Sequence, residues 1–175
     1  NLAGTRHSLV AWKFHAEGAV NTAVTVADGK VYFGSNGGVF YGLKESDGSL
    51  VWETRIDPVE NGARKQFSVP LVLDGKLYFG GANKEVYCLD AKSGEIEWQT
   101  KLSDWIRSKP AMTSKGLMVA SVDGKIACLG KSDGRIQWCK TFSTHQIYSD
   151  LVSAGDSVLV SDSDLWLRRI DASGD

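Results

Sequence analysis

The sequence predicts an all-β protein, a β-propeller of four-stranded antiparallel blades with about four blades present. Four tryptophans recur at intervals of 40, 46 and 40 residues, and no helical periodicity of apolar residues appears between them. A period of about 40 to 45 residues with about four strands per unit is typical of a β-propeller. The last three tryptophans each end a similar segment, in which a strand and a tight polar turn come first: Val39–Trp52, Val86–Trp98 and Ile126–Trp138.

We expect a single domain over residues 1–175, with blades at about 19–54, 67–101, 110–140 and 146–175. Asp-Gly pairs recur between alternating apolar residues and favour hairpin turns, because both turn positions need positive φ. Their regular spacing indicates turns between strands and not a phosphate-binding loop. The pairs begin at Asp28, Asp47, Asp74, Asp123 and Asp133.

The two ends of the chain allow two interpretations of how the propeller ring is completed. Residues 8–14, which include Trp12, have the pattern of an orphan outer strand, and the fourth repeat stops before its own tryptophan strand. In the first interpretation the N-terminal strand completes the fourth blade and closes a small ring, which removes exposed sheet edges. In the second, the chain is about half of a seven- or eight-bladed propeller, completed by further blades or by a second copy in a homodimer.

The tryptophans are expected to be structural and not a ligand platform. Each lies on the outermost strand of a blade, where its indole can pack flat against the neighbouring blade. Burying a ring of about 150–250 Å² at about 25 cal/mol/Å² contributes on the order of 4–6 kcal/mol before entropy costs. A glycine four residues earlier lets the turn tighten. The predicted docking set is Trp12, Trp52, Trp98 and Trp138 with Gly48, Gly94 and Gly134.

The second repeat resembles the tryptophan-docking motif of propellers of the pyrroloquinoline-quinone (PQQ) dehydrogenase type, Ala-x-Asp-x-x-Thr-Gly-x-x-x-Trp. Cys88, Asp90, Ser93, Gly94 and Trp98 match it, with Cys for Ala and Ser for Thr. The other repeats match in part. They depart from the motif at Lys44 and Gly130, which replace the aspartate, and at Arg169, which replaces the small residue.

The resemblance covers nearly the whole chain and points to the non-catalytic, BamB-like members of the PQQ-like repeat superfamily. Its dehydrogenases hold PQQ and calcium on the propeller axis with ligands from several blades, and the alcohol-oxidising members often have adjacent bonded cysteines. No Cys-Cys pair exists here. The resemblance therefore implies the fold without the cofactor. Kelch repeats are less similar, because only one repeat has their pattern in register, Gly80-Gly81 followed by Tyr87 and Trp98. The marks of WD40 repeats are absent.

Charge and cysteine content exclude several classes of function. The formal net charge of −1 does not favour a nucleic-acid partner, and the apolar runs are too short to span a bilayer. Three cysteines (Cys88, Cys128 and Cys139) without a Cys-x-x-Cys pair predict neither a disulfide framework nor a zinc site. Unpaired thiols leave a cytoplasmic location open, whereas the family resemblance favours the periplasm or the extracellular space.

No catalytic or metal-binding constellation is evident. His7, His15 and His145 lie far apart, without a second ligand at a metal-like spacing. The run Ser161–Asp164 lacks the glycine and the distal glutamate of a calcium loop. We therefore expect no enzyme activity, no metal and no cofactor.

A partner is expected on one face of the propeller. If the strands of each blade run in order from the axis outward, the linkers between blades share a face with the turns between second and third strands. An exposed tryptophan beside an arginine, as at Trp105 and Arg107, is typical of an interface hot spot. The predicted partner-binding residues are Trp105, Arg107, Arg64, Lys65, Asn83, Tyr148 and His145.

The sequence therefore predicts a non-enzymatic scaffold that binds a protein or peptide through this face. Two alternatives stay open. The chain could be part of a PQQ- or metal-dependent oxidoreductase whose remaining ligands lie elsewhere, or a small-ligand or glycan sensor that uses the axial funnel.

Overall fold

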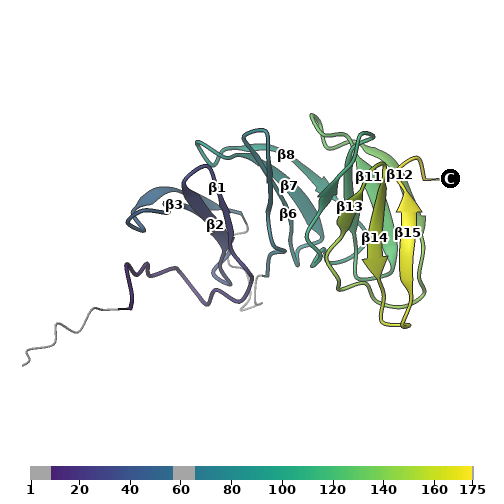
Figure 1. The fold of residues 1–175 in the computed structure, drawn as a ribbon, viewed down its shortest axis with the longest axis horizontal. Coiled ribbons are helices and arrows are strands. Elements are labelled where there is room, and N and C mark those ends of the chain that lie inside the picture. Colours follow the sequence, from purple (N-terminus) through teal and green to yellow (C-terminus); the bar gives the residue numbers. More distant parts are fainter. Residues whose placement is uncertain (1–8, 57–65, 175) are drawn as a thin grey trace, which may run out of the picture.

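The computed structural model describes residues 9–56 and 66–174, and every regular element in these ranges is a β-strand. Four antiparallel sheets follow one another along the chain; the first three have four strands and the last has three. Figure 1 shows these sheets side by side in chain order, as successive blades of a propeller that do not close into a ring. The predicted all-β propeller fold is confirmed.

Each blade is a meander whose strands pair in chain order. The first strands of neighbouring blades contact each other, β1 with β5 and β9 with β13, so these strands lie nearest the axis. The first blade contains β1 (Thr25–Ala27), β2 (Lys30–Gly34), β3 (Val39–Lys44) and β4 (Leu50–Arg55). The second contains β5 (Leu71–Leu73), β6 (Lys76–Gly80), β7 (Glu85–Asp90) and β8 (Ile96–Lys101). The third contains β9 (Ala111–Met112), β10 (Leu117–Ala120), β11 (Lys125–Leu129) and β12 (Ile136–Thr141), and the fourth β13 (Val152–Ala154), β14 (Ser157–Ser161) and β15 (Leu167–Asp171).

The N-terminal segment differs from its prediction. Residues 9–14 form no strand and do not pair with β15, so they do not complete the fourth blade. Their side chains hold them instead: Trp12, Phe14 and Ala16 pack against the outward face of the first blade, where Phe14 meets Tyr41 with ring centroids 5.2 Å apart. This packing covers apolar residues on a face that has no preceding blade in the described structure.

Alternation explains why the middle strands of a blade are almost entirely apolar. On β6, Leu77 and Phe79 face the first blade, whereas Tyr78 faces the third. Both faces are buried because a blade packs on each side. Phe79 stacks on Phe40 of the first blade with ring centroids 4.0 Å apart. The core therefore lies between the sheets, in layers.

Each docking tryptophan packs on the glycine of the next repeat. Trp98 shows the arrangement: its ring occupies the space that a Cβ on Gly134 would need, and its Nε1 donates a hydrogen bond to the carbonyl of Lys131 at 3.2 Å. The glycine has a φ of +66°, so it both forms the turn and makes room for the indole. The same pairing joins Trp12 to Gly48, Trp52 to Gly94 and Trp138 to Gly174.

One face of the propeller gathers the linkers between blades and the turns between second and third strands. Equivalent backbone hydrogen bonds of 2.8–3.0 Å join each turn to the linker beside it. We call this side the loop face; it lies along the lower edge of the molecule in Figure 1. The four bonds run from Asn36 to Ala19, Ala82 to Gln66, Val122 to Trp105 and Ser163 to Gln146.

Candidate binding site on the loop face

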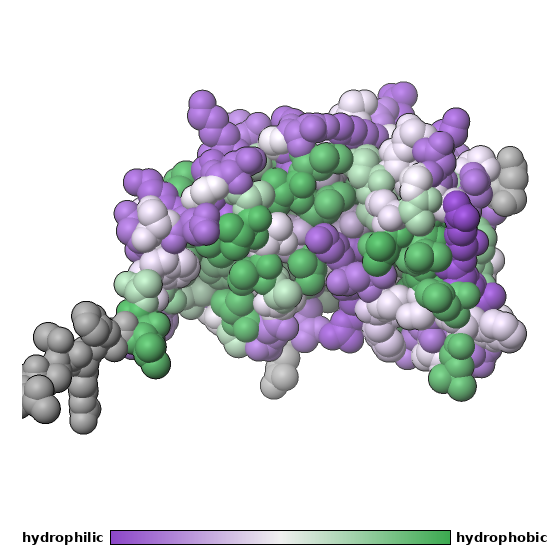
Figure 2. Space-filling model, in the orientation of Figure 1, coloured by the Kyte–Doolittle hydropathy of each residue, from purple (hydrophilic) through white to green (hydrophobic). Residues whose placement is uncertain are grey.

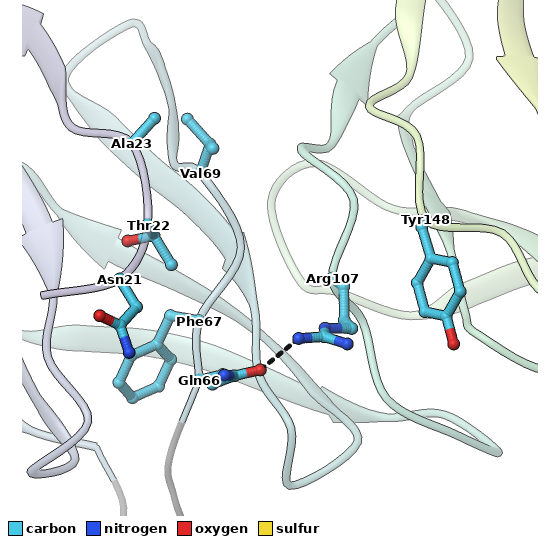
Figure 3. Close-up of a pocket in the computed structure, with 8 residues that line it drawn as sticks. All are labelled: Asn21, Thr22, Ala23, Gln66, Phe67, Val69, Arg107 and Tyr148. Atoms are coloured by element: carbon cyan, nitrogen blue, oxygen red, sulfur yellow. Dashed lines mark hydrogen bonds between the residues drawn. The ribbon is translucent and has the colours of Figure 1, made fainter. Parts of the chain in front are cut away.

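A pocket of about 420 Å³ opens on the loop face. The segments that lead into the first strand of each blade, numbered here as the first to the fourth linker, all contribute to its wall, so no single repeat forms it alone. Figure 3 shows Arg107 near its centre, with Gln66 on one side and Tyr148 on the other. The lining residues are Asn21, Thr22, Ala23, Gln66, Phe67, Val69, Arg107 and Tyr148.

The segment of the second linker from Gln66 to Ser68 is one residue shorter than the equivalent segments of the next two linkers, Trp105–Ser108 and Gln146–Ser149. Ser68 and Ser149 are equivalent, because each hydroxyl accepts a 2.9 Å hydrogen bond from the end of its blade's second strand. Tyr148 precedes Ser149 as an extra residue, at the position that Arg107 occupies in the third linker. No extra residue precedes Ser68, and Arg107 extends toward this gap (Figure 3).

Arg107 is held in place by three neighbours. Its guanidinium lies 5.9 Å from the ring centroid of Trp105 and 5.6 Å from that of Tyr148. It also donates a hydrogen bond to the side-chain oxygen of Gln66. Within residues 9–56 and 66–174 it forms no ion pair with a carboxylate. The cation is therefore oriented by aromatic rings and one amide while its charge stays uncompensated there.

The buried residues of the third linker direct these side chains outward. Ile106 and Ser108 are fully buried, whereas Trp105 is 43% exposed. Ile106 lies against Gly80, where a Cβ would collide with it. The alternation of exposed and buried residues thus fixes Trp105 and Arg107 on the surface side of the linker.

The structure brings together three of the residues predicted for partner binding, Trp105, Arg107 and Tyr148. Asn83 lies apart from the pocket and organises the β6–β7 turn: its amide donates to the hydroxyl of Tyr87 at 2.6 Å. His145 lies on the loop face with its Nδ1 3.6 Å from Asp164. Arg64 and Lys65 lie outside the described residues.

Sequence reasoning did not include an exposed apolar pair in the β14–β15 turn. Leu165 is 97% exposed and Trp166 is 59% exposed. Both residues precede β15, which begins only at Leu167, because Leu165 adopts a φ of +65° that an extended strand does not allow. Alignment of the four turns was the available signal, since this position is glycine in two of the other three repeats.

Asp162 holds that turn in shape. Its side chain is only 2% exposed, and its carboxylate accepts hydrogen bonds from the backbone amides of Asp164 and Trp166 and from the guanidinium of Arg168. Burial alone would raise the pKa of Asp162, but hydrogen bonds from Ser143, Arg168 and the backbone outweigh it and lower the pKa to about 2.

The lowered pKa of Asp162 predicts an acid-dependent loss of stability. Its folded-state pKa lies below the ordinary value of 3.8, so the stabilisation is present above that value and is lost as pH falls toward 2. We expect Asp162→Asn to be less stable than the wild type at pH 7, with a difference that shrinks below about pH 5. Urea unfolding at a series of pH values measures this, and a difference that stays constant with pH would contradict it.

The residues around the pocket do not fit the calcium–quinone site of the dehydrogenases. The pocket lining includes one cation and no carboxylate. No group of three or more His, Cys, Asp or Glu within the described ranges is arranged to hold a metal ion. Burial raises the pKa of the Cys88 thiol to about 12, which leaves it protonated and unreactive near neutral pH. The same ranges contain no helix long and apolar enough to cross a membrane.

Fold and repeat motif together define a PQQ-like repeat propeller. The profile of the family described as "Outer membrane protein assembly factor BamB" matches residues 8–105 and 59–175, and the chain belongs to this family. Comparison with curated proteins finds no significant match.

Solved structures confirm the architecture. BamB from Moraxella catarrhalis is similar with a TM-score of 0.78 at 20% identity, over 94% of this chain and 52% of that one. The computationally designed Ika4 protein gives 0.78 at 12% identity, over 94% of this chain and 99% of that one. Sqt1 of Saccharomyces cerevisiae gives 0.75 at 12% identity, over 89% and 47%. The chain thus spans about half the length of the BamB and Sqt1 structures that it matches.

Proposed function

We propose that this chain is a non-enzymatic scaffold that binds a polypeptide partner through the loop-face pocket. The observation that carries the proposal is Arg107, an exposed cation held between Trp105 and Tyr148 at the pocket. Aromatic and arginine side chains on a rigid surface are the typical anchors of protein interfaces. Membership of the BamB family is consistent with such a role.

The pocket suggests how a polypeptide would be held. Arg107 has N–H groups beyond the one bonded to Gln66, and these can donate to a carbonyl or carboxylate oxygen of the partner. Tyr148 is 48% exposed and offers a flat ring with little conformational entropy to lose. Phe67 and Val69 add apolar wall to the same pocket. This combination of one cation, amides and aromatic surface suits a peptide segment.

Arg107→Gln is expected to weaken peptide binding about tenfold or more, because it removes the charged hydrogen-bond donor from the pocket. A random peptide library displayed on phage is selected on the immobilised protein, and the dissociation constant of a selected peptide is measured by fluorescence. The matched control is Arg135→Gln: Arg135 is 88% exposed and lies in a β11–β12 turn at the opposite end of the strands.

Two outcomes would count against the proposal. The first is selection of peptides whose affinity is the same for the wild type and Arg107→Gln. The second is quinone absorbance and dye reduction after incubation with PQQ and calcium, which would support the oxidoreductase alternative instead.

A further inference from the structure

The β14–β15 turn carries an apolar tip that the fold does not bury. Leu165 is 97% exposed and the neighbouring Trp166 is 59% exposed. Figure 2 shows a hydrophobic protrusion at the lower right, where Figure 1 places the turn between β14 and β15. Single exposed apolar residues are ordinary on protein surfaces, but a leucine and a tryptophan together on a protruding turn are not.

Backbone geometry shows that the conformation of the turn does not require a leucine at position 165. Leu165 lies four residues after the last residue of the second strand, as do Gly38, Lys84 and Gly124 in the other blades. All four have positive φ, at +65°, +81°, +71° and +83°. Glycine adopts this conformation without strain, whereas leucine does so rarely. The fourth blade therefore keeps an exposed leucine at a position where the fold favours glycine.

The turn that carries the tip is hydrogen-bonded to the linker that contributes Tyr148 to the pocket. The amide of Ser163 in the turn donates to the carbonyl of Gln146 at 3.0 Å. The side chain of the same Gln146 accepts a 2.6 Å hydrogen bond from the hydroxyl of Tyr148, which lines the pocket. Two hydrogen bonds through Gln146 thus join the turn that carries Leu165 to the wall of the pocket.

We propose that Leu165 and Trp166 form a second anchor of the loop-face site, covered by an apolar side chain of the polypeptide that binds beside Arg107. The inference rests on the proposed function. Charge favours a polypeptide over an anionic lipid surface: residues 162–168 contain two aspartates and one arginine. That arginine, Arg168, is ion-paired with Asp162 at 2.9 Å, so the tip carries no excess positive charge to attract lipid headgroups.

Leu165→Gly separates the recognition role from a structural one. Glycine removes the apolar side chain and relieves the backbone, so the melting temperature should stay unchanged or rise by up to about 4 °C. Binding of the phage-selected peptide should nevertheless weaken about tenfold. Ile96→Thr is the control, because Ile96 is 40% exposed on the outer strand β8 and its replacement keeps the β-branched shape.

The outcomes distinguish failure of the second anchor from failure of the proposed function. If Arg107→Gln weakens the peptide and Leu165→Gly does not, the second anchor is wrong and the proposed function stands. If neither variant changes the affinity, both proposals fail. Binding of the wild type to phosphatidylcholine–phosphatidylglycerol vesicles that is lost in Leu165→Gly, without a change in peptide affinity, would make the tip a lipid contact and overturn the inference.

Discussion

Trp98→Ala is expected to lower the free energy of unfolding by about 3–5 kcal/mol, the usual cost of removing a buried aromatic side chain. Trp98 is 8% exposed and packs between the second and third blades, with its ring centroid 6.0 Å from that of Tyr78. The change would leave a cavity above Gly134, whose left-handed turn has no side chain to fill it. It would also remove the hydrogen bond to the carbonyl of Lys131. Urea unfolding followed by circular dichroism measures the loss.

Trp105→Ala is the matched control for that experiment. Trp105 is also a tryptophan, but it is 43% exposed and lies on the loop face, so its removal should cost no more than about 0.5 kcal/mol. If Trp98→Ala does not fold, Trp98→Phe keeps an aromatic ring at the site and should show a smaller loss. Equal stabilities of Trp98→Ala and Trp105→Ala would contradict a structural role for the docking tryptophans.

The repeat pattern was sufficient to predict the architecture because it encodes contacts between blades as well as strands. The period of the tryptophans, the turn glycines and the alternation within β6 and β7 all depend on the same stack of sheets. The pattern did not show which glycine each indole contacts. Trp98 packs on Gly134 and not on Gly94, four residues earlier in its own turn. That contact joins different repeats, so the spacing within one repeat cannot reveal it.

Strand ends were harder to predict than strand centres. Residues 9–14 have the composition of an outer strand, yet a strand requires a partner, and packing of Trp12 and Phe14 against the first blade holds this segment instead. The short inner strand β1 begins only at Thr25, although the β-favouring run starts at Val20. Composition therefore predicted apolar surface correctly but did not predict hydrogen-bond partners.

The candidate site was predictable only in part, because its contacts also join residues from different repeats. Trp105 and Arg107 stand close in the sequence, and their exposure followed from the expected loop face. The contacts of Arg107 with Gln66 and Tyr148 depend on linkers that lie about 40 residues away in each direction. The segment from Gln66 to Ser68 is one residue shorter than its equivalents in the next two linkers, and this difference has no signature within any single linker. It becomes visible only when the linkers are superposed through their hydrogen bonds.

Gly124→Ala is expected to lower the free energy of unfolding by about 2–4 kcal/mol, through backbone strain and a collision together. Gly124 has a φ of +83°, and a Cβ there would collide with the backbone carbonyl of Ser143. That carbonyl cannot easily move, because the amides of Phe142 and Ser143 both bond to the carbonyl of Gly124, at 3.0 and 3.1 Å. Chemical denaturation of the variant measures the combined cost.

Gly29→Ala separates the two contributions to that cost. Gly29 has a similar φ of +68°, but no atom lies within 4 Å of the position of its missing Cβ. Its replacement should therefore cost only the strain of a left-handed alanine, about 1–2 kcal/mol. The excess cost of Gly124→Ala over Gly29→Ala measures how rigidly the third-blade turn is joined to the linker that carries Tyr148. If the two variants were equally stable, the linker would yield to a single methyl group, and the loop-face pocket would lack the rigid wall on which its proposed role in recognition depends.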